Sequence, residues 1–500
     1  MKELAAKLFA RYVVTKNKRW INNPINAQKA TLKQLISTAQ NTQFGKDHAF
    51  DQITDHKTFK NHVPVRDYEG LKPYIEKIRA GEEDVLWPGV PLYLSKTSGT
   101  TSGAKYIPIS KASMPTHIEA ARDALLTYIH TTGNSRFISG KQIFLQGSPS
   151  LDSSKGIPIG RLSGIVAHYV PSYLQKSRMP SWATNCIEDW EEKVDAIVDE
   201  TLIEKMTLIG GIPSWVQMYF EKINQKTNQT VAEVFPDFSL FVYGGVNFEP
   251  YRSVFKNLIG KQVDTIELFP ASEGFFAYQD QQNEEGLLLL LNNGIFYEFI
   301  PVDEFGQDAP NRLCLEEVEE GVNYVLILST TAGLWGYNIG DTVRFVSTKP
   351  YRLVVTGRVK HFISAFGEHV IGKEVETAMK TATANTPIRV REFTVAPQVS
   401  PKQGLPYHEW LIEFDVEPEN MVDFASALDA AMEAQNVYYH DLIKGKVLRP
   451  LEVTPVVKKG FQDYMKSIGK LGELLASMKD DQVPTRRLFD TPHRYRHNDN

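Results

Sequence analysis

Features that mark secreted, membrane-spanning and zinc-binding proteins are scarce in this chain. Only two cysteines occur among its 500 residues, Cys186 and Cys314. Two thiols so far apart in sequence predict neither a disulfide framework nor a zinc site, and they are typical of a reducing compartment. The longest apolar run extends from Leu287 to Leu291, far below the roughly 20 residues that span a bilayer. We therefore expect a soluble protein.

The chain also lacks an excess of basic residues. Lysine and arginine number 55, and aspartate and glutamate number 60, which gives a formal net charge of -5. Such a balance provides no positive field for nucleic acid or anionic lipid, so neither is an expected partner. Basic residues interrupt the apolar residues of positions 1–20, which predicts an amphipathic helix and not a signal peptide. The expected location is cytoplasmic.

Length and patterning predict a multidomain protein of the α/β class, because 500 residues exceed one ordinary core. Residues 187–206 carry a single apolar stripe at helical spacing. Short apolar runs at 207–209, 241–243 and 266–269 each end in a turn. Strands that alternate with helices predict mostly parallel sheets flanked by helices, with ligands at the carboxyl ends of the strands.

A change of pattern places a domain boundary near residues 347–358. Residues 287–347 are rich in predicted strands, whereas two helices and two strands are expected beyond the boundary. We predict a large N-terminal domain over residues 1–350 and a small α+β C-terminal domain over residues 351–500, joined by a hinge. The C-terminal elements are expected at residues 370–384, 389–395, 410–414 and 420–436.

A loop rich in glycine and hydroxyl residues extends from Ser95 to Lys105. Gly99 and Gly103 free its backbone to curl around an anion, and Lys105 adds a positive charge. The hydroxyl donors along this loop are Ser95, Thr97, Ser98, Thr100, Thr101 and Ser102. This composition suits the β- and γ-phosphates of a nucleotide. Tyr106 follows the lysine, so the loop is not a Walker A motif. The alternative is a flexible polar linker.

Three later segments place charged residues after predicted strands or glycine turns. Phe269–Gly274 includes Glu273, and Gly333–Asp341 ends in a carboxylate after a glycine turn. The third segment, Gly357–Glu376, begins with a glycine–arginine pair. Taken singly, each carboxylate is more often a helix cap or a solvated turn, and the arginine is more often part of a surface ion pair. Their order behind the loop favours a nucleotide site.

In this order and at these spacings, the four segments resemble the core motifs of the adenylate-forming superfamily. That superfamily includes acyl-CoA synthetases, luciferases and peptide-synthetase adenylation domains. Within it, the chain resembles the auxin-responsive (Gretchen-Hagen) acyl-acid amido synthetases, whose plant members conjugate hormones to amino acids. The segments that carry this closer resemblance are Asn41–Lys46, Val63–Glu69, Ile78–Glu82 and Leu86–Gly89.

The resemblance implies an α/β adenylation domain at residues 1–350 that binds ATP and Mg²⁺. The loop from Ser98 to Lys105 would hold the ATP phosphates. Glu273 would be the Mg²⁺ ligand, and Ser272 would lie near the α-phosphate. Asp341 would accept hydrogen bonds from the ribose hydroxyls, as a carboxylate can from two vicinal donors.

The resemblance also implies a place for the adenine ring and for the hinge. Tyr243, Gly244 and Gly245 would flank the adenine, with Phe269 as a further wall. Core packing explains the two aromatic residues equally well, because both lie in apolar strands. Arg358 would be the hinge-region arginine that reaches the nucleotide, and the C-terminal domain would rotate about it.

The resemblance is weakest near the C-terminus. Related adenylating enzymes use a C-terminal lysine to bridge the substrate carboxylate and the α-phosphate, whereas here Gln482 stands at the expected place. Lys479 and Lys470 are the nearest substitutes, and Lys479 is preferred, although both fit solvated surface lysines. The expected catalytic residues are therefore Lys105, Glu273 and Lys479.

These features predict a ligase that joins a carboxylic acid to an amine, expected to be an amino acid, through an acyl adenylate. Attack by a carboxylate on the α-phosphorus needs no general base, because the nucleophile is already ionised at neutral pH. Residues 111–130 and 160–173 are candidates for the acyl pocket. Arg122 is a candidate partner of the acid, although a surface position is the simpler expectation. Two alternatives remain open: an acid–thiol ligase that uses coenzyme A, and a catalytically silent acid- or nucleotide-binding protein.

Overall fold

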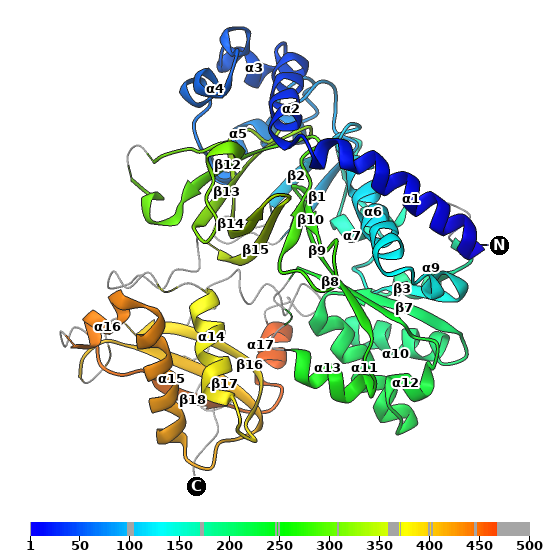
Figure 1. Cartoon of the computed structure of the whole chain (residues 1–500), viewed down its shortest axis with the longest axis vertical. Coiled ribbons are helices and arrows are strands. Elements are labelled where there is room, and N and C mark those ends of the chain that lie inside the picture. Colours follow the sequence, from blue (N-terminus) through cyan, green and yellow to red (C-terminus); the bar gives the residue numbers. More distant parts are fainter. Residues whose placement is uncertain are drawn as a thin grey trace. The chain divides into compact units, whose positions relative to one another are not determined.

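The computed structural model divides the chain into two compact units, Met1–Val355 and Thr356–Asn500, which are described separately (Figure 1). The described residues are 2–97, 105–170, 175–245, 248, 251–307, 310–358, 370, 372–398, 401, 404–444 and 448–467. An α/β first unit and an α+β second unit match the predicted fold class. The functional assignment of residues 1–350 and 351–500 stays a prediction.

An 11-stranded sheet forms the centre of the first unit, in the order β12-β13-β14-β15-β11-β10-β9-β8-β7-β3-β6. Neighbours from β6 to β9 are parallel. The pairs β9–β10, β10–β11, β11–β15, β12–β13 and β13–β14 are antiparallel. The bounds are β3 Lys141–Phe144, β6 Arg178–Met179, β7 Met206–Gly211, β8 Leu240–Gly244, β9 Asp264–Ala271, β10 Gly274–Tyr278, β11 Leu287–Leu289, β12 Ile295–Pro301, β13 Asn323–Thr330, β14 Tyr337–Thr348 and β15 Tyr351–Arg358.

Parallel pairing is confined to one end of this sheet, so the prediction of mostly parallel sheets holds only for that end. Connection length explains the difference. A parallel pair needs a crossover of a dozen or more residues, but only Ser272 and Glu273 join β9 to β10. Apolar runs predict that strands exist, whereas their direction depends on these short connections.

Helices on the parallel end of the sheet build one hydrophobic core with its strands. They are α10 Trp190–Thr201, α11 Pro213–Thr227, α12 Val231–Val234 and α13 Arg252–Ile259. The apolar stripe predicted over residues 187–206 is the buried face of α10, with Trp190, Val194 and Ile197 in the core. The Asp189 side chain begins this helix by accepting a hydrogen bond from the backbone N–H of Glu192.

The remaining helices of the first unit come mainly from the N-terminal third of the chain. Their bounds are α1 Lys2–Ile21, α2 Pro24–Ala39, α3 Gln43–Asp47, α4 His56–His62, α5 Tyr68–Arg79, α6 Met114–Thr132, α7 Leu162–Ala167 and α9 Trp182–Asn185. The helix predicted at residues 1–20 is α1, which lies along α6 (Figure 1). Among the described helices, none combines the length and apolar character needed to cross a bilayer.

A smaller sheet in the first unit has the order β2-β1-β5-β4. Its bounds are β1 Tyr93–Thr97, β2 Lys105–Ile109, β4 Asp152–Ser154 and β5 Ile157–Gly160. β1 and β2 are antiparallel, and their last pair joins Thr97 to Lys105. The ends of the predicted phosphate loop are therefore held opposite one another.

The second unit has its own sheet and its own core. Strands β16 Arg389–Gln398, β17 Tyr407–Val416 and β18 Glu452–Val456 form a three-stranded sheet. The helices are α14 Gly372–Thr383, α15 Met421–Gln435, α16 Val437–Lys444 and α17 Gly460–Ser467. Trp410 of β17 and Leu428 of α15 are fully buried in this core. Both predicted helices and both predicted strands of the C-terminal part are present.

A buried ion pair ties the N-terminal helices to the edge strand β12. Glu298 of β12 is 1% exposed, and its carboxylate accepts hydrogen bonds from Arg312 at 2.5 Å and from His56 of α4 at 2.8 Å. Arg312 also donates to the backbone carbonyl of Val63. Burial raises the pKa of Glu298, but the charge of Arg312 and the two side-chain hydrogen bonds outweigh that effect and lower it. Glu298 is therefore ionised and paired.

We predict that Arg312→Leu lowers the free energy of unfolding by about 3–5 kcal/mol, because the buried Glu298 carboxylate loses its charged partner. Denaturant titrations that follow the unfolding of the first unit measure this change. Lys29→Ala is the matched control, because it breaks the exposed Lys29–Glu316 pair and should cost no more than about 1 kcal/mol. Equal losses in the two variants would contradict the prediction.

Candidate active site

The candidate site begins where the sheet changes from parallel to antiparallel pairing. β8 and β9 run parallel, with Gly244 beside Leu268. β9 then turns back into β10, and Ala271 pairs with Gly274 across the turn. A Cβ added at Gly274 would lie 2.6 Å from the end of the Ile295 side chain, so Ile295 would have to move to accept a larger residue there. The turn between them places Ser272 and Glu273 at the carboxyl end of β9, where α/β sheets bind ligands.

A hydrogen bond between two serines joins this turn to the smaller sheet. Ser95 of β1 is fully buried, and its hydroxyl lies 2.9 Å from the hydroxyl of Ser272. Ser95 is only two residues from Thr97, after which the predicted phosphate loop begins. The near end of that loop is therefore held beside Ser272 and Glu273. The predicted loop residues Ser98, Gly99, Thr100, Thr101, Ser102 and Gly103 lie outside the described residues.

Lys105 begins β2 at the far end of the same loop. Its ammonium group lies 5.9 Å from the centre of the Tyr68 ring, a distance at which a cation is attracted to an aromatic face. The Tyr68 hydroxyl accepts a hydrogen bond from the backbone N–H of Tyr106. Burial raises the pKa of Tyr68, so the phenol stays neutral. Lys105 is half-buried and carries the positive charge that the loop was predicted to supply.

Tyr337 connects Glu273 with the strand that carries Asp341. Tyr337 opens β14, is 1% exposed, and donates a hydrogen bond to the Glu273 carboxylate at 3.5 Å. Between Asn338 and Thr342 the pairing of β14 with β13 shifts, and Gly340 has a φ of +92°. Such bulges change where a side chain points and are frequent beside active sites. Asp341 lies in this irregular stretch and is half-buried.

Tyr243 and Phe269, predicted as walls of the adenine site, are both buried in hydrophobic cores. Tyr243 is 6% exposed and stacks on Phe248 with ring centres 4.5 Å apart. Phe269 is 8% exposed and lies edge-on to Phe276 at 5.0 Å. Core packing accounts for most of the surface of both rings. Their contact with adenine stays a prediction.

The two glycines after Tyr243 are explained by different structural constraints. A Cβ on Gly244 would stand 2.4 Å from the carbonyl oxygen of Leu268, so close strand packing explains this glycine. Gly245 has a φ of +84° and is exposed, and an added Cβ would meet only Ile212 at 3.8 Å. Its glycine is explained by backbone conformation. Neither observation depends on a nucleotide.

The remaining predicted residues are Arg358, Arg122 and three residues near the C-terminus. Arg358 is the last residue of β15 and belongs to the second unit, so its reach to the nucleotide stays a prediction. Lys470, Lys479 and Gln482 lie beyond the described residues. Arg122 donates two hydrogen bonds to Asp123 and is 38% exposed. The surface interpretation of Arg122 therefore accounts for its contacts.

A buried histidine lies in the stretch predicted to line the acyl pocket. His117 of α6 is 5% exposed, and its Nδ1 has no hydrogen-bond partner among the described residues. Burial lowers the pKa of His117 to about 4, because an imidazolium there would lose its hydration. At neutral pH this side chain is uncharged and offers one polar atom within an apolar environment.

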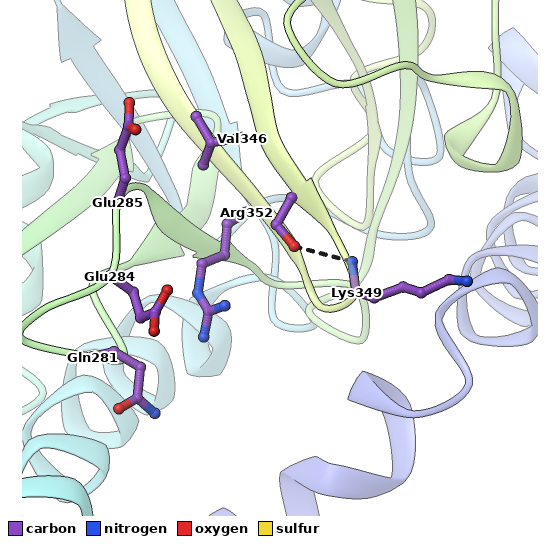
Figure 2. A pocket seen from close by; sticks show the side chains of 7 residues that line it. Gln281, Glu284, Glu285, Val346, Lys349 and Arg352 are labelled. Carbon is purple, nitrogen blue, oxygen red and sulfur yellow. Dashed lines mark hydrogen bonds between the residues drawn. The ribbon is translucent and has the colours of Figure 1, made fainter.

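A polar hollow of about 460 Å³ lies elsewhere on the first unit (Figure 2). The side chains around it are those of Gln281, Glu284, Glu285, Val346, Ser347, Lys349 and Arg352. Arg352 is already paired with Asp280 at 2.7 Å. None of the predicted site residues lines this hollow. Its charged lining does not suit the apolar body of an acyl group.

Sequence patterns missed the role of Tyr337 in the cluster and the contact that Ser95 makes with Ser272. Both fall inside the segments that carry the motifs, but neither residue type stood out there. Ser95 was one of six hydroxyl donors predicted along the loop, and Tyr337 was assigned no role within its segment. Their importance comes from the partners they reach, Ser272 and Glu273, which lie far away in sequence. A pairing of this kind is visible only after folding.

His117 generates a prediction about acid stability. The unfolded chain takes up a proton near pH 6.5, whereas the folded chain does so only near pH 4. Stability should therefore be complete above pH 6.5 and fall with decreasing pH by about 1.4 kcal/mol per unit. His117→Gln removes this proton uptake and should lose about 2 kcal/mol less than the parent protein between pH 7 and pH 5. Identical pH dependences in denaturant titrations would contradict the assignment.

Comparison with known protein families gives matches along most of the chain. The model of the GH3 family N-terminal domain matches residues 15–186, that of the GH3 family central domain matches residues 288–358, and that of the GH3 family C-terminal domain matches residues 373–484. Together the three matches cover more than half of the chain. They include the segments that carry Lys105, Asp341 and Arg358.

Curated relatives are similar over nearly the whole chain. The chain is 23% identical to the jasmonoyl--L-amino acid synthetase GH3.5 of Oryza sativa subsp. japonica, over 90% of this chain and 91% of the relative. It is 21% identical to the indole-3-acetic acid-amido synthetase GH3.3 of Arabidopsis thaliana, over 88% of this chain and 86% of the relative.

Solved structures share the fold. AtGH3.15 acyl acid amido synthetase in complex with 2,4-DB superimposes with a TM-score of 0.77 at 16% sequence identity, over 92% of this chain and 91% of that chain. A 2-hydroxyisobutyryl-CoA ligase in complex with 2-HIB-AMP is more distant, with a TM-score of 0.57 at 12% identity, over 89% of this chain and 86% of that chain. The chain thus shares the fold of these two proteins.

Proposed function

The chain belongs to the GH3 family, and from this premise we propose that it is an ATP-dependent acyl-acid amido synthetase. A carboxylate oxygen of the acid attacks the α-phosphorus of ATP, and the bond to pyrophosphate breaks. The nitrogen of an amine, expected to be an amino acid, then attacks the carbonyl carbon of the acyl adenylate. AMP leaves with the bonding electrons, the nitrogen loses a proton to solvent, and an amide remains.

The observation that carries this proposal is the meeting of three separate segments at the carboxyl end of β9. Ser95 brings the flank of the predicted phosphate loop to Ser272, and Tyr337 brings the Asp341 strand to Glu273. Loop, turn and bulged strand are the parts that the resemblance assigns to phosphates, metal and ribose. Their convergence supports one nucleotide site in the first unit.

The residues of the cluster fit ATP and Mg²⁺ in their chemistry. Glu273 offers carboxylate oxygens next to hydroxyl groups, and Mg²⁺ takes oxygen ligands, several of them from phosphate and water. When bound, Mg²⁺ supplies charge neutralisation for the phosphates. Asp341 would hold the ribose hydroxyls, and Ser272 and Lys105 would orient the phosphates. The site would hold two anions, the carboxylate of the acid and ATP, close to one another. Positioning and positive charge achieve this without a general base.

The C-terminal part of the proposal concerns Arg358 and Lys479. Arg358 would contact the nucleotide during one half-reaction, and rotation of residues 351–500 would exchange the adenylation and amidation arrangements. Lys479 would bridge the acid and the α-phosphate. Adenylation assays of Lys479→Ala and Lys470→Ala decide between these lysines, and full activity in both variants would remove the role. A cytoplasmic location completes the proposal.

Two assays separate this function from its alternatives. We expect acid-dependent exchange of pyrophosphate into ATP for at least one member of a panel of aryl, alkyl and indolyl carboxylic acids. Mass spectrometry of reactions with that acid should then detect an amide with an amino acid and no thioester with coenzyme A. A thioester alone would identify an acid–thiol ligase. ATP binding without exchange for any acid would identify a silent binding protein.

We predict that Glu273→Ala abolishes Mg²⁺-dependent pyrophosphate exchange while the protein keeps its circular dichroism spectrum. The loss is expected because the carboxylate is the only metal ligand assigned to the site. Glu285→Ala is the matched control, because this exposed carboxylate lines the polar hollow and not the candidate site. Unchanged exchange in Glu273→Ala would refute the metal role.

A further inference from the structure

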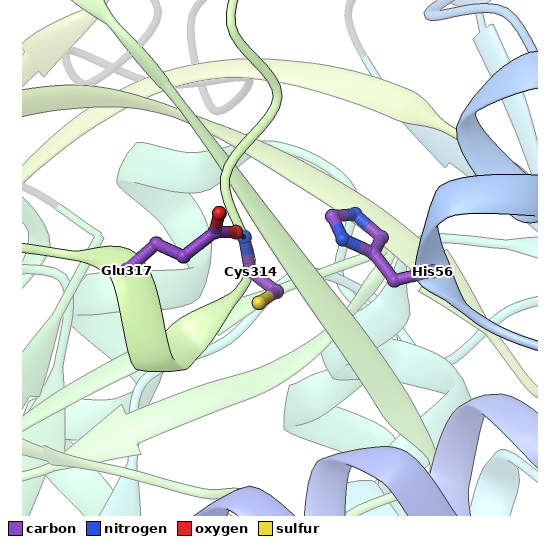
Figure 3. A group of neighbouring side chains, drawn as sticks. All are labelled: His56, Cys314 and Glu317. Carbon is purple, nitrogen blue, oxygen red and sulfur yellow. Dashed lines mark hydrogen bonds between the residues drawn. The ribbon is translucent and has the colours of Figure 1, made fainter.

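A second group of metal-ligand side chains lies outside the candidate active site. His56 of α4, Cys314 and Glu317 each offer one ligand atom, and these atoms lie within 4.8 Å of one another (Figure 3). Cys314 and Glu317 come from η5 Leu315–Glu317 and the residue before it. None of the three has a part in the proposed adenylation. They are far apart in sequence and meet only through the fold.

A buried carboxylate holds His56 in the orientation of a metal ligand. Its Nε2 lies 2.8 Å from the Glu298 carboxylate, and Glu298 is ionised in a buried ion pair with Arg312. The Nε2 atom therefore donates to Glu298, which leaves Nδ1 as the ring nitrogen available to a metal. The ring also packs edge-on against Phe296 at 5.7 Å. Metal-binding histidines typically donate their other N–H to a carboxylate in this way.

Cys314 and Glu317 are brought together by a local cap. The backbone N–H of Cys314 donates to the Glu317 carboxylate at 2.8 Å, which folds that side chain back over the start of η5. The Cys314 thiol points to the same region and lies 3.8 Å from a Glu316 oxygen. In Figure 3 the His56 ring faces Cys314 and Glu317 from the opposite side. One thiol, one imidazole and one carboxylate thus offer ligand atoms that lie within 4.8 Å of one another.

We propose that His56 Nδ1, Cys314 Sγ and a Glu317 carboxylate oxygen form a zinc(II) site, completed by a water molecule. Thiolate and imidazole ligands favour zinc over Mg²⁺. Bond lengths of 2.0–2.3 Å place tetrahedral ligands about 3.3–3.8 Å apart, so side-chain movements of about 1 Å close the site. Zinc replaces the thiol proton, which is released to solvent.

The site would tie α4 to η5 on the outer side of β12. His56 already reaches β12 through Glu298, and Glu317 belongs to the segment that joins β12 to β13. A metal bond adds a second connection between these parts. Because zinc binds only the folded arrangement of the three side chains, it raises the stability of the folded first unit. Its role is structural and independent of adenylation.

Cobalt(II) is the probe for this site, since it occupies zinc sites and reports on its ligands by absorption. Titration of the full-length protein in excess Mg²⁺ should give one equivalent of a near-ultraviolet thiolate-to-cobalt band, and zinc(II) should abolish it. Cys314→Ser should lose the band, whereas Cys186→Ser, the matched control at the other cysteine, should retain it. Absence of the band in the parent protein, or its loss only in Cys186→Ser, overturns the site.

Two further variants test the supporting interactions. Glu298→Gln should weaken cobalt binding by about 10- to 100-fold without abolishing the thiolate band, because it perturbs a ligand through its partner. His56→Gln removes the ligand itself while leaving Glu298 paired with Arg312, and it should lose tight binding. Unchanged affinity in His56→Gln overturns the assignment. Glu273→Ala should keep the band, so failure of the adenylation proposal and failure of the zinc site are distinguishable.

Discussion

The candidate site depends on how β9 pairs with its two neighbours. On one side β9 runs parallel to β8, and on the other it turns back within two residues to run antiparallel to β10. A crossover helix after β9 would carry the chain away from the carboxyl edge of the sheet. The tight turn keeps Ser272 and Glu273 at that edge. Gly274, without a Cβ, leaves room beside this turn for the Ile295 side chain.

Sequence patterns predicted this arrangement in part. The strand that ends before Ser272 and the helix that buries Trp190 and Val194 follow from hydrophobic spacing, because burial of one face requires that spacing. The parallel or antiparallel direction of each strand could not be predicted, because an apolar run carries no information about the strand with which it pairs. The bulge around Asp341 is likewise a consequence of pairing between β13 and β14. The role of Tyr243 could not be predicted from its residue type, because an aromatic side chain fits a hydrophobic core and a ligand site equally well.

The two proposed metal sites differ in the information that predicts them. Glu273 lies in a short contiguous motif next to a strand, and its proposed role follows from the order of that motif among the other segments. The proposed zinc ligands His56 and Cys314 lie far apart in sequence, in segments that no sequence motif connects. A buried carboxylate, Glu298, holds the histidine from behind. Glu298, which joins α4 to the sheet, also orients the proposed zinc ligand His56. Glu298 would therefore contribute both to the stability of the first unit and to zinc binding.

The Ser95–Ser272 contact has a property that a salt bridge there would lack. Either hydroxyl can donate to the other, and whichever accepts keeps its own proton for another acceptor. The polarity of the pair can therefore reverse by rotation of two hydrogens, with no movement of heavy atoms. An anion near Ser272 would select one direction, and a proton donor would select the other. The connection between the two sheets can thus change its polarity without any movement of the backbone.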